Sequence, residues 1–155
     1  MGLTTTTHLN FRGTAREALE YYGEVFDGEV AVTTYGQVGM PAELPDAGKV
    51  VFGGVQAGNG FRVMAYDVPG QQAGAATDPT GSTRRENGVT ITDRPFFVSV
   101  RGATLDETTR YWDRLAEGAS IIEPLGASAW SAGFGMLTDR FGVTWVLDVE
   151  APRAT

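Results

Sequence analysis

Few side chains in this sequence could do chemistry, and most of them have no partner of the right kind. His8 is the only histidine among 155 residues, and the chain contains no cysteine. A protein zinc site takes several His, Cys, Asp or Glu ligands, so a lone imidazole cannot build one. The lack of cysteine also excludes disulfides, thiolate ligands and cysteine nucleophiles. No Ser-His-Asp order and no phosphate-binding loop is present.

His8 lies in a segment where apolar and polar residues alternate, as is typical of a β-strand. Leu9 and Phe11 are the residues that would pack against a helix. Thr6, His8 and Asn10 would then face the opposite side of the sheet, because alternate residues share a face. His8 could act there as a general base or as a hydrogen-bonding group for a ligand. The alternative is an ordinary strand histidine whose ring is satisfied by a neighbour or by water.

The charge of the chain limits the classes of partner that it can bind. The formal net charge is −7 and the pI is about 4.6. Nucleic acid is a poor partner for such a chain, because phosphate binding needs a basic surface. An acidic surface could steer a cationic ligand, although it also serves solubility alone. Glu43 and Asp46 lie in a proline-flanked loop, where we expect solvated charges.

An internal repeat predicts two helices that would position these residues. The matching pairs along the chain are Thr14 with Thr104, Glu17 with Glu107, Tyr21 with Tyr111 and Gly28 with Gly118. A threonine followed three residues later by glutamate can form a capping box, in which each side chain satisfies a free N–H at a helix start. Apolar residues follow each box at helical spacing, and each glycine stands where a helix commonly ends. We therefore expect one amphipathic helix in each half.

Strands are predicted on both sides of each helix. The expected strands are residues 5–11, 29–34, 49–57 and 61–66 in the first half, and 96–101, 119–122, 133–138 and 144–149 in the second. Gly58-Asn59-Gly60 is a tight-hairpin signal between two of them. The order of one strand, one helix and three strands thus occurs twice, which indicates an α+β fold made of two βαβββ modules, about 1–68 and 95–150.

The segment 69–94 joins the two modules. It is rich in Gly, Ala, Gln, Thr and Pro, and it has almost no large apolar residues. We expect a long loop or linker, mobile around residues 71–85, because little apolar surface is available to offset the entropy of ordering. Arg84 and Arg85 could contact an anion or an acidic partner, and otherwise they are solvated charges.

Two motifs, one near each end of the chain, follow a known pattern. They are His8-Leu9-Asn10-Phe11-Arg12-Gly13 and Asp139-Arg140-Phe141-Gly142-Val143-Thr144-Trp145. Together they resemble the PhnB-like branch of the glyoxalase/bleomycin resistance (vicinal oxygen chelate) superfamily, although Arg140 and Val143 stand where its closing signature has Pro and His. The resemblance implies a single domain over residues 1–155 in which each module forms a cupped mixed sheet with one helix.

The resemblance also implies where a metal would bind, which is the concavity of each cupped sheet. The usual ligand positions fall near Thr6, Phe52, Gly54, Pro95 and Val146. Apart from the weak hydroxyl donor of Thr6, none of these residues is a good ligand. We therefore expect neither a metal nor another cofactor. Some relatives carry a name that implies methyl transfer to a ubiquinone precursor, but no strand, glycine-rich turn and helix for a methyl donor is present.

These observations predict a metal-free protein that binds a small organic molecule in a cup. Phe52, Trp130 and Phe134 would form its walls, and His8 and Asn10 would orient the ligand, which the acidic surface makes cationic or neutral. We further expect a cytoplasmic homodimer with no nucleic-acid or membrane partner. The alternatives are a metal-dependent glyoxalase- or dioxygenase-type enzyme with unrecognised ligands, and a structural or regulatory dimer without a ligand.

Overall fold

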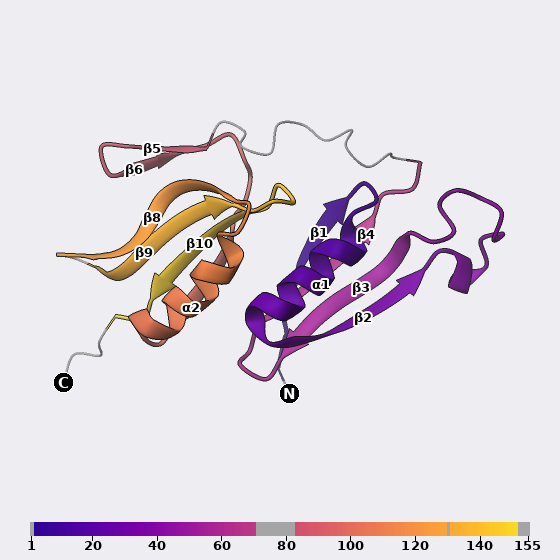
Figure 1. The fold of residues 1–155 in the computed structure, drawn as a ribbon, viewed down its shortest axis with the longest axis horizontal. Coiled ribbons are helices and arrows are strands. Elements are labelled where there is room, and N and C mark those ends of the chain that lie inside the picture. Colours follow the sequence, from indigo (N-terminus) through magenta and orange to yellow (C-terminus); the bar gives the residue numbers. More distant parts are fainter. Residues whose placement is uncertain (1, 71–82, 130, 152–155) are drawn as a thin grey trace. The chain divides into compact units, whose positions relative to one another are not determined.

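The computed structural model describes residues 2–70, 83–129 and 131–151 of the chain. Contacts divide it into a first unit, Met1–Ala76, and a second unit, Thr77–Thr155 (Figure 1). The first unit contains β1 (Thr7–Phe11), α1 (Ala15–Phe26), β2 (Gly28–Thr34), a short 3-10 helix (Gly36–Val38), β3 (Val50–Ala57) and β4 (Arg62–Asp67). The second contains β5 (Arg84–Glu86), β6 (Val89–Ile91), β7 (Val98–Gly102), α2 (Leu105–Leu115), β8 (Ser120–Ser128), β9 (Ser131–Thr138) and β10 (Thr144–Val149).

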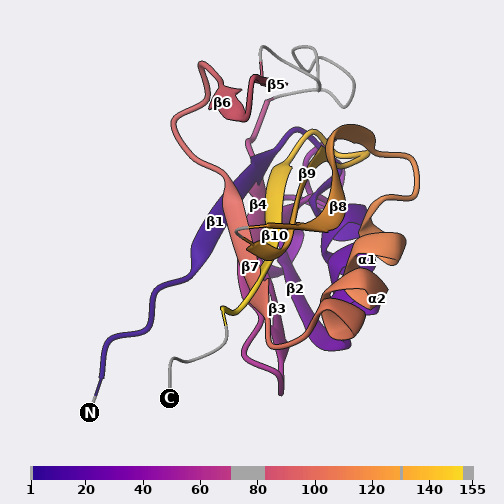
Figure 2. The same ribbon diagram turned by 90° about the vertical axis from the view of Figure 1, so that its left-hand side faces the viewer.

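The two units repeat one sheet topology, which confirms the predicted pair of βαβββ modules. The strand order is β1-β4-β3-β2 in the first unit and β7-β10-β9-β8 in the second. The first strand of each module pairs in parallel with the last, and the other pairs are antiparallel. Each sheet is therefore mixed, and one helix lies along one of its faces, as Figure 2 shows for α2.

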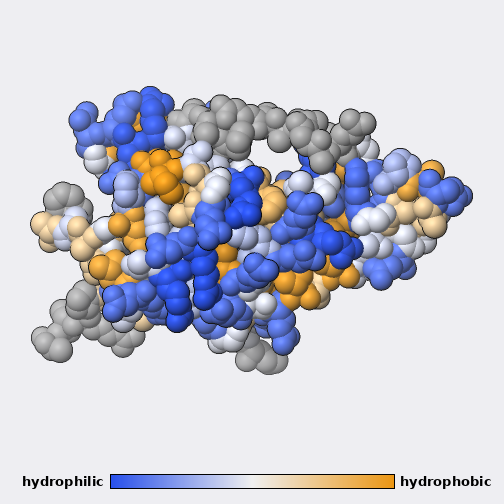
Figure 3. All heavy atoms as spheres, in the orientation of Figure 1, coloured by the Kyte–Doolittle hydropathy of each residue, from blue (hydrophilic) through white to orange (hydrophobic). Residues whose placement is uncertain are grey.

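Each helix buries its apolar side against its own sheet. In α1 this side consists of Ala15, Ala18, Leu19, Tyr22, Val25 and Phe26, and in α2 of Thr108, Tyr111, Trp112 and Leu115. The outward surface of α2 is hydrophilic (Figure 3). A Cβ at Gly53 would lie 2.5 Å from Leu19, and one at Gly135 would lie 2.8 Å from Trp112, so these glycines allow helix and sheet to approach closely. No helix in the described ranges is long and apolar enough to cross a membrane.

The two helices begin differently, although the sequence predicts one capping box for both. The Thr104 hydroxyl accepts a hydrogen bond from the Glu107 N–H at 3.1 Å, which confirms the predicted cap of α2. Within the described residues, Thr14 makes no such side-chain bond, so the box predicted for α1 is wrong. The carboxylate of Asp67, at the end of β4, instead accepts from the N–H groups of Gly13 at 2.7 Å and Ala15 at 3.0 Å.

Asp67 also connects the helix start to the rest of the first unit. Its second carboxylate oxygen accepts a hydrogen bond from the Val50 N–H at 2.9 Å, and its carbonyl accepts one from the Tyr35 hydroxyl at 2.7 Å. Burial raises the pKa of that hydroxyl, and the charges of Tyr66 and Asp67 raise it further. Asp67 is only 1% exposed, and the N–H groups of Gly13, Ala15 and Val50 supply the hydrogen bonds that its buried carboxylate needs.

The ends of the helices also differ from the prediction in one half. Gly118 has a positive φ of 73°, as expected after α2. In the first half Asp27 takes the left-handed position, with φ 57°, and Gly28 already begins β2. A Cβ at Gly28 would lie 2.5 Å from the side chain of Val55, so this glycine serves strand packing.

The segment predicted as a linker contains a hairpin. Strands β5 and β6 pair antiparallel, and the turn residues Asn87 and Gly88 have φ values of 50° and 77°. An Asn-Gly turn with two positive φ angles is a strong hairpin signal, which the composition of the segment obscured. Residues 71–82, to which most of the mobility prediction applies, lie outside the described part of the chain.

Asp46, predicted as a solvated loop charge, is paired. Its carboxylate lies 2.6 Å from the Lys49 ammonium and accepts a hydrogen bond from the Gly70 N–H at 2.8 Å. The hydrogen bond from Lys49, together with that from Gly70, lowers the pKa of Asp46 below its usual value. This pairing ties the loop before β3 to the residues that follow β4.

We predict that Asp67→Asn lowers the free energy of unfolding by about 2–4 kcal/mol, because three hydrogen bonds lose a charged acceptor. The amide NH₂ group would also face backbone N–H groups that it cannot satisfy. Urea denaturation followed by circular dichroism measures the change.

Two threonine variants serve as controls for this prediction. Thr104→Ala should cost about 1 kcal/mol, as a lost helix cap does, whereas Thr14→Ala should stay within about 0.5 kcal/mol. Equal losses in the two threonine variants would show that Thr14, rather than Asp67, caps α1.

Candidate functional site

The face of the first sheet that points away from α1 carries three of the predicted site residues. In β1, Leu9 and Phe11 are buried whereas His8 and Asn10 are exposed, which confirms the predicted alternation. His8 pairs with Met64 of β4 in the strand register, and Asn10 with Tyr66. Phe52 of β3 is exposed on the same side. We refer to this side of the sheet as the open face.

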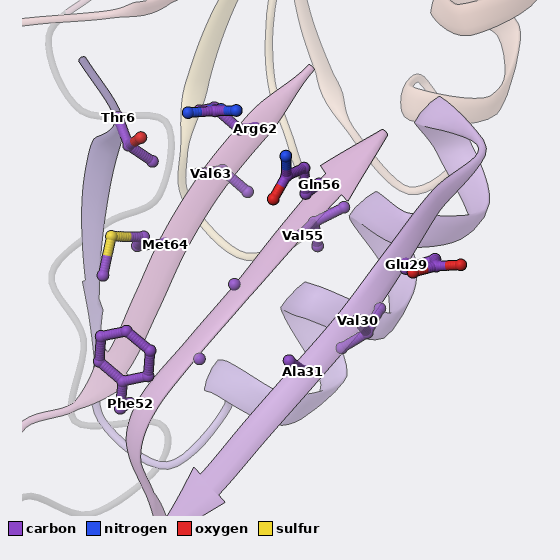
Figure 4. Close-up of a pocket in the computed structure, with 12 residues that line it drawn as sticks. Thr6, Glu29, Val30, Ala31, Phe52, Val55, Gln56, Arg62, Val63 and Met64 are labelled. Carbon is purple, nitrogen blue, oxygen red and sulfur yellow. The ribbon is translucent and has the colours of Figure 1, made fainter. Parts of the chain in front are cut away.

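A hollow of about 360 Å³ lies on the open face (Figure 4). Its lining comes from all four strands or their ends and includes Thr6, Glu29, Ala31, Phe52, Gly54, Gln56, Arg62 and Met64. Gly54 pairs with Ala31 on one side and Met64 on the other. The small residues leave space in the middle of the sheet, and the larger side chains stand around that space.

One end of the open face is apolar. Figure 4 shows the Phe52 ring next to the Met64 thioether. Phe52 is 58% exposed, although it lies within a strand that is paired on both sides. An aromatic ring and a flexible thioether make an adaptable apolar surface for another molecule.

A polar cluster flanks this apolar surface. His8 Nδ1 lies 3.2 Å from Asn10 Oδ1, and the His8 ring meets the Tyr66 ring edge-on with centroids 5.3 Å apart. Because Asn10 Oδ1 can only accept, Nδ1 is the donor in this pair. In the tautomer that carries its proton on Nδ1, Nε2 can accept a hydrogen bond. The cluster can thus orient a ligand that carries a donor group.

The other end of the open face is charged, and its residues are not among those predicted from the sequence. Arg62 and Gln56 are register partners across β4 and β3, and Gln56 is also the partner of Glu29 on β2. The alternation of β4, which buries Val63 and Ala65, would have placed Arg62 on the open face by the same argument that placed His8.

The second sheet carries Phe134 on the face that points away from α2, and the chain itself covers that ring. The guanidinium carbon of Arg85, in β5, lies 4.9 Å from the Phe134 ring centroid. Arg85 Nη1 donates a hydrogen bond to the Thr90 hydroxyl at 2.8 Å, and that hydroxyl donates to the Met136 sulfur at 3.4 Å. Met136 is 1% exposed.

These contacts show that the β5–β6 hairpin packs on the second sheet. Arg85 is therefore not a solvated linker charge, which corrects the prediction for this residue. Its Nε lies 3.8 Å from a carboxylate oxygen of Glu123 and has no hydrogen-bond partner among the described residues. Trp130, the remaining predicted wall residue, lies outside the described ranges, so its role stays a prediction.

The positions where relatives would hold a metal do not fit one here. Phe52 and Gly54 lie on the open face of the first sheet and Thr6 lines its hollow, while Val146 pairs with Ser99 and Met136 in the second sheet. Only the Thr6 hydroxyl could donate to a cation. The described residues also contain no group of three or more His, Cys, Asp or Glu that could hold a metal ion.

We predict that Arg85→Ala loosens the hairpin. The change removes a cation–π contact and a side-chain hydrogen bond, so the free energy of unfolding should fall by about 1–2 kcal/mol. Faster hydrogen exchange at the backbone amides of β5 and β6 would report the loss locally.

Arg84→Ala is the matched control. Arg84 is exposed, and its Nε lies 2.6 Å from a carboxylate oxygen of Glu86, which is equally exposed. Removing this side chain should therefore change the free energy of unfolding by no more than about 0.5 kcal/mol. Equal exchange rates in the two variants would contradict a specific role for Arg85.

Comparison with known proteins places both modules in one family pattern. The family model for the Glyoxalase/Bleomycin resistance protein/Dioxygenase superfamily matches residues 7–147. Protein YjdN of Escherichia coli (strain K12) is 24% identical over 155 residues, which are 96% of this chain and 96% of that protein. The match therefore spans β1 to β10 and includes both sheets.

Solved structures show the same relationship. Protein PA1353 from Pseudomonas aeruginosa is 30% identical, with a TM-score of 0.72 over 96% of this chain and 98% of that one. A PhnB protein from Bacillus cereus, named as a candidate 3-demethylubiquinone-9 3-methyltransferase, is 26% identical. Its TM-score is 0.67 over 96% of this chain and 100% of that one.

Proposed function

This chain belongs to the glyoxalase/bleomycin resistance protein/dioxygenase superfamily, and from that premise we propose that it binds a small organic molecule without a metal. The open face of the first sheet is the proposed binding surface. The observation that carries the proposal is Phe52, a large apolar side chain that is 58% exposed beside a hollow of about 360 Å³. Small-molecule sites commonly have volumes of roughly 300–1,000 Å³.

The apolar end supports binding because covering it would be favourable. Burial of apolar surface contributes about 25 cal/mol per Å². Phe52 and Met64 offer such surface side by side (Figure 4), and Phe52 is 58% exposed. A flat apolar molecule could fill the hollow and displace water from both side chains.

The polar cluster would give the complex its orientation. The His8 ring contacts Asn10 and Tyr66, and with the proton on Nδ1 its Nε2 can accept a hydrogen bond. A few placed polar groups within an apolar surface are typical of small-molecule sites. This arrangement supports a binding protein better than a metal enzyme, because the cluster brings together one imidazole, one amide and one phenol, and Glu29 lies at the other end of the hollow.

We predict that a neutral aromatic probe, 4-phenylbutanamide, shifts the NMR signal of the Met64 methyl group in protein labelled with ¹³C at its methionine methyls. Phe52→Ala should raise the dissociation constant about tenfold, which corresponds to about 1.4 kcal/mol of binding free energy lost with the apolar contact. A titration of both proteins measures the effect.

The chain offers matched controls for this test. Phe96 is exposed to almost the same extent as Phe52, 56% against 58%, but lies in the second unit, so Phe96→Ala should leave the affinity unchanged. The Met136 methyl, buried under the hairpin, should not shift. Elemental analysis of protein purified without chelator completes the test. A stoichiometric divalent metal that is lost in His8→Ala would contradict metal-free binding.

We also propose that the protein is a homodimer. Each four-stranded sheet ends in two edge strands, and exposed apolar residues lie on two of them, Val30 on β2 and Ile121 on β8. Such edges are available for pairing with a second copy. Light scattering at micromolar concentration should give twice the chain mass of 16.5 kDa. The mass of a single chain would refute the dimer.

A further inference from the structure

One cationic side chain lines the hollow on the open face. Among the residues that line it, the charged ones are Arg62 and Glu29. Gln56 stands between them, as the register partner of Glu29 across β2 and β3 and of Arg62 across β3 and β4. In the described part of the chain, neither charged side chain forms a hydrogen bond or an ion pair. Arg62, which is half-buried as a residue, therefore has its guanidinium donors available for a ligand.

Two further donors lie at the same end of the hollow. Thr6 precedes β1 and is next to Arg62, because the following residues, Thr7 and Val63, are register partners. Figure 4 shows Thr6, Arg62 and Gln56 together at this end. A guanidinium can bind both oxygens of a carboxylate through two parallel hydrogen bonds. The Thr6 hydroxyl and the Gln56 amide can add donors to the same group.

The charges around the hollow favour a group with a single negative charge. One guanidinium neutralises one carboxylate, while Glu29, two strands away, would repel a second charge. The start of α1, where backbone N–H groups could bind a phosphate, belongs to the opposite face and is already occupied by Asp67. A monocarboxylate therefore fits this end better than a phosphate.

This local charge differs from what the net charge predicts. The net charge of −7 favours a cationic or neutral ligand at long range. Salt screens such long-range effects beyond about 8–10 Å, whereas a direct contact between a carboxylate and the guanidinium of the half-buried Arg62 is screened much less. The charge of the residues that line the hollow, rather than the net charge of the chain, should therefore determine which ligand binds more tightly.

We infer that the ligand of the open face is a monocarboxylate with an apolar body. Arg62 receives the carboxylate, and the body lies on Met64 and Phe52. The inference rests on the proposed function, since it assumes that the open face binds a small molecule. It adds the chemical class of that molecule and a specificity-determining residue.

The test compares 4-phenylbutyrate with 4-phenylbutanamide, which has the same shape without the charge. Both are titrated against the Met64 methyl signal. The wild-type protein should bind the carboxylate about tenfold more tightly than the amide. In Arg62→Gln the two affinities should become equal, while that of the amide stays within about twofold of wild type.

Arg16→Gln is the matched control. Arg16 is exposed on α1, on the opposite side of the sheet, so this variant loses the same charge from the same unit. It should keep the tenfold preference. Glu29→Gln should strengthen carboxylate binding, because a nearby negative charge is removed. Circular dichroism melting checks that each variant folds.

The outcomes separate the two proposals. Equal wild-type affinities for the two probes, with the Met64 signal shifting, would overturn the inference and leave the proposed function in place. A carboxylate preference that survives in Arg62→Gln would overturn the role of Arg62. If neither probe shifts the Met64 signal, both proposals fail.

Discussion

Each four-stranded sheet of this protein has two faces, and the described residues supply one helix to each sheet. In the second unit the β5–β6 hairpin covers part of the remaining face, with Arg85 over the Phe134 ring and Met136 fully enclosed. In the first unit no described element does so, and Phe52 stays exposed beside the hollow. The same module thus has one sheet face that its own unit partly fills and one that carries an exposed aromatic ring beside a hollow.

The helix starts show how far local sequence could predict this fold. Both modules carry the same threonine and glutamate spacing, yet only Thr104 acts as a cap. In the first module a carboxylate 52 residues from Ala15 takes the helix N–H groups. The corresponding position in the second module, paired with Gly102 as Asp67 is with Phe11, is Val149, which has no acceptor. A capping motif can be recognised from neighbouring residues in the sequence. The competing acceptor, Asp67, reaches the start of α1 only because β1 and β4 pair in the folded protein.

The sequence predicted those residues of the candidate site whose side of the sheet follows from strand alternation alone. A period of two puts His8 and Asn10 on one face whatever the rest of the chain does. Arg62 and Met64 follow from the same rule, but they attract attention only once the hollow is known. The covering of Phe134 depends on a hairpin whose contacts are mainly polar, such as Arg85 with Thr90, so the apolar content of the segment could not indicate it. Its Asn-Gly turn could.

The two arginines that face the sheets differ in what surrounds them. Arg85 lies against a phenylalanine, a threonine and a nearby glutamate of its own unit, so its guanidinium serves packing. Arg62 has a glutamine beside it, and the nearest acidic lining residue is one strand further away. A glutamate at position 56 would sit next to Arg62 and could pair with it, as charges directly opposite on neighbouring strands do. Gln56 instead keeps the two charges of the hollow apart, so that Arg62 has no acidic register partner on β3. The proposed recognition of a carboxylate depends on this separation, because a guanidinium already paired with a neighbouring carboxylate would have fewer donors left for a ligand.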